Sequence, residues 1–239
     1  MENLDLPVAE TKTTGPWALL MKVLTEPRAA FESLKAKPAA FQPYLILVLV
    51  AVVTGILAYA KTADLSMQNA AAGGGSPEML GTMKTVGMVL APIGAAVTTL
   101  GVSLVSAAVL LFLGTLLDGK ASFKQMFSMV GYASLPSGVI GGLVKAAMVA
   151  TTPASAIQGV NTSAALFLPR SEFGTVLYQV LSLLDPFAIW TISLTIIGYA
   201  VMTGFSNKKA AAVVIPLWLA ANAIGLAIAA RAMKSIPKA

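Results

Sequence analysis

Apolar residues fill five long stretches of this 239-residue chain, with most polar and charged residues between them. The stretches are continuous and about twenty residues or longer, which is the length that an α-helix needs to cross a bilayer. Membrane β-strands would instead alternate polar and apolar residues over about ten positions. The pattern therefore predicts an all-α membrane protein, a bundle of about five transmembrane helices. The expected spans are about 44–60, 86–117, 126–150, 176–205 and 211–230.

Residues 16–37 differ from these spans because charged residues lie between their apolar ones. The apolar positions recur at steps of three and four, as on one face of a helix; they include Trp17, Leu20, Leu24, Phe31 and Leu34. The segment is too charged to span, so we predict an N-terminal amphipathic helix lying in the membrane interface. Packing on the protein's own cytoplasmic face is the alternative. We expect Pro27 to divide the helix, with Thr25 capping the second half.

The remaining segments are polar. We expect a disordered tail at residues 1–15 and a flexible loop at 61–84, which contains NAAAGGGSPE. Residues 151–174 are expected to form a second polar loop. The transmembrane domain would thus cover residues 43–231 and be followed by a basic tail at 232–239.

The third predicted span contains a proline and a lysine. Pro136 lies among small residues, in ASLPSGVIGG, and should bend or unwind the helix. Unwound backbone at membrane depth lines binding sites in transporters, whereas a kink that serves packing is the simpler interpretation. Lys145 is an ionisable residue inside a span and hence a functional candidate, unless its side chain extends to the headgroups.

The fourth predicted span is interrupted by Asp185, which is followed by Pro186 and Trp190. An aspartate cap before a first-turn proline is a normal helix start. The alternative is a buried carboxylate that binds a proton or cation, or pairs with Lys145. In the fifth span, Asn222 is a candidate for a hydrogen bond across helices.

Small residues line one face of two predicted spans, which would let neighbouring helices approach closely. We expect leucine to disturb packing at Gly101 or Gly225. The face in the second span comprises Ala95, Thr99, Ser103 and Ala107.

Composition narrows the chemistry further. Only 11% of residues are charged, against about 25% in soluble domains. The chain has no cysteine and no histidine, which excludes disulfides, thiolate nucleophiles and Cys/His zinc sites. An aspartyl pair of Asp118 and Asp185 is the one conceivable catalytic arrangement. We predict no enzymatic activity, no cofactor and no metal.

The net charge of +6 arises mostly from basic residues beside the apolar stretches. That placement is typical of topology signals and of contact with anionic lipid, rather than of nucleic-acid binding. Five spans place alternate loops on opposite sides of the membrane, and the side that holds the N-terminus has more basic residues. This favours a cytoplasmic N-terminus, although the basic C-terminal tail argues against it.

Several of these pieces together resemble the Yip1-domain membrane proteins in their bacterial form. They are LTEPRAAFESLKAKP, LGTLLDGKASFKQMFSMVGYASLP, LLDPFAIWTISLTIIGYA and SNKKA, in this order between residues 24 and 210. The resemblance implies five spans with a cytoplasmic N-terminus and offers no catalytic residues to carry over. Eukaryotic relatives associate with small GTPases of vesicle traffic; the short N-terminal segment here puts that interaction in doubt.

Two functions are consistent with these observations. The first is a non-catalytic adaptor or membrane-organising scaffold in the cell (inner) membrane, in contact with lipid and with other membrane proteins or a second copy. The second is a small-solute or ion transporter or channel that uses broken helices near Pro136 and Asp185. Matching breaks in an internal repeat would favour transport, but five spans fit such a repeat poorly.

Overall fold

The computed structural model describes residues 15–74, 76–173 and 175–234, and these residues form helices and turns without any strand. In chain order the longer helices are α1 (Pro16–Thr25), α2 (Pro27–Ala36), α3 (Phe41–Ala72), α4 (Pro77–Leu116), α5 (Phe123–Ala133), α6 (Gly141–Thr151), α7 (Val176–Ser182), α8 (Pro186–Thr203) and α9 (Asn207–Lys234). Short helical turns join them: a π-helical turn η1 (Pro136–Ile140) and 3₁₀ turns η2 (Ala154–Gly159), η3 (Ala164–Phe167) and η4 (Arg170–Glu172). The predicted tails at 1–15 and 232–239 lie largely outside the described residues.

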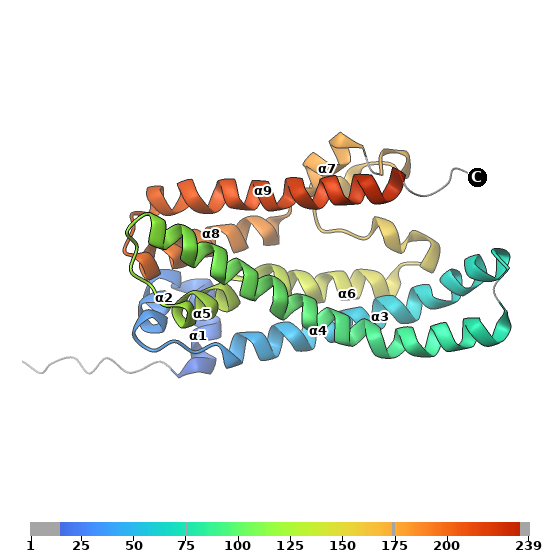
Figure 1. The fold of residues 1–239 in the computed structure, drawn as a ribbon, viewed down its shortest axis with the longest axis horizontal. Helices are drawn as coiled ribbons and strands as arrows, with labels where there is room; N and C mark the ends of the chain where they lie inside the picture. Colours follow the sequence, from blue (N-terminus) through green and yellow to red (C-terminus); the bar gives the residue numbers. More distant parts are fainter. Residues whose placement is uncertain (1–14, 75, 174, 235–239) are drawn as a thin grey trace, which may run out of the picture.

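The chain passes along the bundle five times, as the apolar stretches predicted. Figure 1 shows α3, α4, the α5–α6 pair, α8 and α9 running along the long axis, with α1 and α2 at one end. Four helices are long and apolar enough to cross a membrane singly, and the bent pair of Phe123–Ala133 and Pro136–Thr151 makes a fifth.

The N-terminal pair α1 and α2 packs on the bundle itself. Phe31 and Leu34 are completely buried, whereas Trp17 is 53% exposed. Pro27 divides the two helices as predicted, but the capping prediction was wrong: Glu26 is the N-cap residue and provides no side-chain bond. Thr25 instead ends α1 and donates to the carbonyl oxygen of Met21. Interfacial membrane placement of the pair thus stays a prediction.

The flexible loop predicted at 61–84 was wrong. Helix α3 continues to Ala72 and α4 begins at Pro77, so most of the predicted loop is helical. Alanine and other helix-forming residues carry α3 past the apolar stretch. Ser76 caps α4 by accepting a hydrogen bond from the Met79 amide, with proline next in line, the favoured order for a helix start.

The third pass is broken at Pro136 as predicted. Helix α5 and the helix that follows are bent by 43°. Proline provides no amide hydrogen and its ring crowds the carbonyl four residues earlier, and the chain widens there into the π-helical turn η1. Helix α5 itself starts at a capping box formed by Ser122 and Gln125.

The predicted fourth span, 176–205, was too long. Helix α7 ends at Ser182, and the spanning helix α8 begins only at Pro186, after a break at Asp185. Helix α8 ends at Gly204, whose left-handed φ of 82° favours glycine.

The small-residue face of α4 packs as expected, whereas the two glycine predictions were wrong. Ser103 and Ala107 are buried, and a Cβ atom at Gly55 of α3 would lie 3.3 Å from the Ala95 Cβ. At Gly101 and Gly225, however, an added Cβ would contact nothing within 4 Å. Small residues allow a neighbouring helix to approach closely, but they affect packing only where a helix actually lies on that side.

The tightly packed core lies at the end of the bundle that carries α1 and α2. It brings together side chains of α1, α2, α4, α5, α8 and α9, among them Val23, Phe31, Leu110, Met129, Tyr199 and Val214. Tyr44 at the start of α3 is 6% exposed and stacks on Phe127 with ring centroids 4.3 Å apart.

Candidate functional site

The bend at Pro136 is closed by a chain of hydrogen bonds to α8. The Ser137 amide donates to the Thr191 hydroxyl oxygen at 3.2 Å. The Thr191 hydroxyl in turn donates to the Ser137 oxygen at 2.9 Å. A backbone group freed by a break inside a membrane must find a partner within the protein, and Thr191 provides it here.

Glycines around the same bend let two helices approach it closely. A Cβ atom at Gly138 would lie 2.3 Å from a methyl carbon of Leu47 on α3. At Gly141 it would lie 3.1 Å from the ring of Phe187 on α8. The broken helix is therefore packed from two sides, and its geometry favours a structural kink over a binding site open to a solute.

Asp185 has the position of a helix cap. One carboxylate oxygen accepts hydrogen bonds from the amides of Phe187 and Ala188, at 2.8 and 3.2 Å. The other accepts a short hydrogen bond from the Thr162 hydroxyl. All three donors come from this chain, so the carboxylate is half-buried but satisfied.

The other predicted positions do not gather around Asp185. Lys145 is exposed on α6, and the ion pairs among the described residues are Arg28–Glu32 and Lys84–Asp64, without Lys145 or Asp185. Trp190 is 38% exposed. The Asn222 amide donates to the Trp218 carbonyl oxygen of its own helix at 2.8 Å rather than across helices.

The aspartyl pair is ruled out by distance. Asp118 follows α4 in a turn with φ of 64°, and the neighbouring Lys120 amide bonds to the Thr203 carbonyl oxygen at the C-terminal end of α8. Asp185 lies at the other end of the same helix. Its 18 residues put about 27 Å between the two ends.

We expect Asp185→Asn to leave thermal stability in detergent nearly unchanged, because asparagine also caps helices well. Asp185→Ala should lower the free energy of unfolding by about 1 kcal/mol, since the caps on Phe187 and Ala188 are lost. Thermal unfolding of the two variants side by side checks this. Equal losses in both would mean that the negative charge itself is required.

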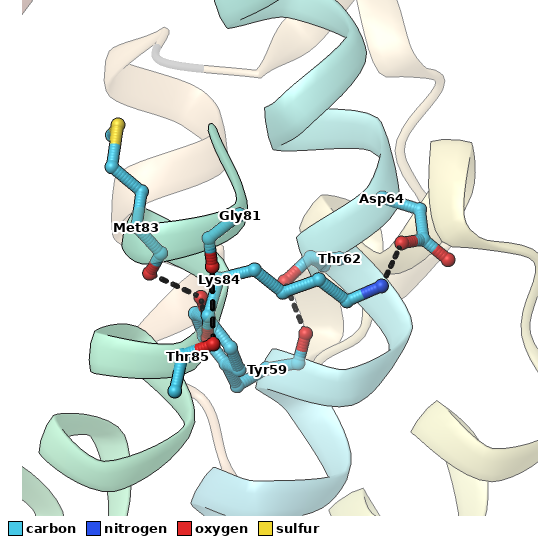
Figure 2. Close-up of polar contacts among 7 residues, drawn as sticks. All are labelled: Tyr59, Thr62, Asp64, Gly81, Met83, Lys84 and Thr85. Carbon is cyan, nitrogen blue, oxygen red and sulfur yellow. Dashed lines mark hydrogen bonds and ion pairs between the residues drawn. The ribbon is translucent and has the colours of Figure 1, made fainter. Parts of the chain in front are cut away.

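The sequence interpretation missed a polar junction between α3 and α4, shown in Figure 2. The Tyr59 hydroxyl shares its hydrogen between the carbonyl oxygens of Met83 and Lys84, at 3.3 and 3.1 Å. The Lys84 ammonium lies 2.6 Å from the Asp64 carboxylate. Gly87 makes room for the tyrosine, because a Cβ there would lie 2.0 Å from the hydroxyl oxygen.

This junction fixes the register of the hairpin more than it adds stability. Both partners of the Lys84–Asp64 pair are largely exposed, and exposed ion pairs contribute little. The fit of Tyr59 against Gly87 allows one alignment of the two helices. A signal was present in the sequence, since the opposite charges of Asp64 and Lys84 lie at similar distances, eight and seven residues, from the helix ends at Ala72 and Pro77.

Three lysines extend to the C-terminal carbonyls of other helices. Lys35 donates to the Val201 oxygen at the end of α8, at 2.7 Å. Lys209 donates to the Leu117 oxygen after α4, and Lys61 to the Ala150 oxygen near the end of α6, both at 2.8 Å. Cations are favourable at helix C-termini, which carry partial negative charge, so these lysines tie one helix to the next.

One hollow, of about 270 Å³, opens beside Lys35. Its lining includes Arg28, Glu32 and Phe205. Arg28 is paired with Glu32 at 3.2 Å, and Lys35 is bonded to α8, so the polar groups around the hollow already have partners. The hollow therefore has the character of a junction between α2 and α8.

The arrangement of five passes, a broken third span and an aspartate-capped fourth can be compared with known proteins. A family model described as the Yip1 domain matches residues 21–229. The chain belongs to the Yip1 family. The resemblance identified in the sequence is thereby confirmed.

A relative of this Yip1-domain protein is "Membrane protein YknW" of Bacillus subtilis (strain 168). The two are 27% identical over 191 residues, which is 79% of this chain and 80% of that protein. No solved structure matches this chain. The Yip1 family is not known for enzymatic activity, and membership supports a membrane location with several spanning helices.

Proposed function

We propose that this Yip1-domain protein is a non-catalytic adaptor or membrane-organising scaffold of the inner membrane, with its N-terminus in the cytoplasm. The observation that carries this proposal is the length of the α3–α4 hairpin. Helix α3 has 32 residues and α4 has 40, or about 48 and 60 Å at 1.5 Å per residue. A bilayer core is about 30 Å thick.

Even helices tilted by about 40° would extend beyond the hydrocarbon at these lengths. The sequence between α3 and α4 is glycines and a serine, and the Lys84–Asp64 pair nearby is charged, so this is the end that favours water. Figure 1 shows the same end reaching past α6 and α9. The hairpin is thus an ordered arm, aligned by Tyr59, on which another membrane protein could dock.

The packing of the bundle supports the adaptor over the transporter. The buried polar side chains among the described residues are those of Ser103, Ser128, Ser163 and Thr203, with no buried charge. The polar groups at both breaks, Pro136 and Asp185, are used in bonds within the chain. A transport path would need polar groups that are available to a solute.

Single cysteines test the proposal, because the chain has none of its own. Ser66→Cys places a photo-cross-linker on an exposed position of the arm, and Ser193→Cys places one on an exposed position of α8. We expect a discrete cross-linked product in native membranes from position 66 and none from 193. Adding Gly87→Leu, which collides with Tyr59, should abolish the product.

The same preparations separate the two functions. Purified protein in liposomes should show no flux of ions or small solutes beyond empty liposomes. Flux that Asp185→Asn abolishes, with no cross-linked product from position 66, would instead establish the transporter.

A further inference from the structure

The segment between the third and fourth spans exposes many of its large apolar side chains. Ser163 and Ala165 are buried at 6% and 1% exposure, whereas Phe167 is 88% exposed and Val176 is 75% exposed. Leu166, Leu177, Val180 and Leu184 are each about half exposed. Water favours the opposite arrangement, because apolar side chains are driven from it.

A polar network holds the segment together from within. The Asn161 side-chain oxygen accepts hydrogen bonds from the Ser163 amide and hydroxyl, at 3.1 and 2.8 Å. The Ala164 amide donates to the Leu184 carbonyl oxygen at 3.1 Å. The Ala164 bond joins η3 to the chain that follows α7, and the apolar side chains remain on the outer surface.

Charged residues are almost absent from this surface. None occurs at positions 146–169 or 173–184, so Arg170 and Glu172 are the charges between Lys145 and Asp185. Aqueous loops of this length normally carry more charge. Helix α8, which is long and apolar enough to cross a membrane, begins directly after this segment.

We propose that η3 and α7 form an interfacial anchor whose outward apolar side chains lie in the lipid of the leaflet remote from α1 and α2. Figure 1 shows α7 displaced along the bundle away from α1 and α2. A helix with an outward apolar face can lie in the interface with that face at the headgroup–acyl boundary, where its backbone ends still reach water. This inference is drawn from η3 and α7 alone, and only the aqueous control at position 66 rests on the adaptor proposal.

Fluorescence from single cysteines in lipid nanodiscs tests the anchor. Phe167→Cys and Val180→Cys are each labelled with an environment-sensitive dye and reconstituted in phosphatidylcholine, with and without spin-labelled acyl chains. Ser66→Cys on the hairpin arm is the matched control. Nanodiscs leave both membrane faces open to an aqueous quencher.

At positions 167 and 180 we expect blue-shifted dye emission that the spin-labelled lipid quenches and that iodide does not quench. Position 66 should show the reverse. Quenching by iodide alone at positions 167 and 180 would overturn the proposal. Shielding from both quenchers would also overturn it, because the surface would then be covered by protein. Leu177→Cys replaces either variant that fails to elute as a single species.

Discussion

Replacing Gly198 with leucine is expected to reduce the thermal stability of the protein in detergent more than any other single glycine change. Gly198 is buried in α8. A Cβ atom there would lie 2.6 Å from the Met129 Cγ on α5 and 3.0 Å from the Phe31 Cζ on α2. Both of those side chains are fully buried, so neither has free space to move into.

Overpacking a filled core costs roughly 1–3 kcal/mol, and leucine adds three carbons beyond the one that already collides. Thermal unfolding followed by tryptophan fluorescence would measure the loss, and size-exclusion chromatography would show whether the bundle stays intact. Gly101→Leu is the matched control, because a Cβ there contacts nothing within 4 Å. Similar stability of the two variants would mean that α8 does not approach α2 and α5 this closely.

The contrast between these glycines shows how far the sequence could predict packing. A run of small residues indicates that a helix can be approached, and this was correct for Ser103 and Ala107 on α4. Nothing in the run says which side the neighbour takes. The sequence therefore pointed to Gly101, where no helix approaches, and missed Gly198, which has other helices against it.

Helix number and membrane character followed from the apolar stretches because crossing a bilayer sets a length that composition alone reveals. Helix ends were less predictable. Residues 61–72 are polar but still favour helix, so α3 outlasts its apolar part. For these residues low hydropathy predicted a loop, whereas helix propensity favours a helix. Packing of α3 along α4 stabilises the helix.

The candidate positions divided in a similar way. Pro136 lacks an amide hydrogen, and the Asp185 carboxylate accepts from amides two and three residues later, so the bend and the cap are local effects that a sequence contains. The predicted roles of Lys145 and Asn222 depended on which residues of other helices lie opposite them, and the sequence does not show this. The Tyr59–Gly87 contact was missed for the same reason, since it joins residues that the predicted loop had separated.

Phe31→Ala should release the N-terminal helices from the bundle. Phe31 is completely buried and lies against the α8 surface at Gly198. Truncating such a phenylalanine costs about 3–5 kcal/mol because it leaves a cavity as well as losing apolar contact. We expect a large fall in thermal stability, together with faster tryptic cleavage at Arg28 and Lys35 as α2 opens locally.

Trp17→Ala distinguishes docking on the protein from attachment to lipid. Trp17 is 53% exposed on α1, so its loss should leave stability in detergent nearly unchanged, where only contacts within the protein count. If lipid mainly held α1 and α2 in place, Phe31→Ala and Trp17→Ala would have similar stability in detergent. Each would then differ from the parent protein only in bilayers. A large loss for Phe31→Ala alone would instead establish α1 and α2 as part of the folded bundle, because the side chain that matters would be the one buried between α2 and α8.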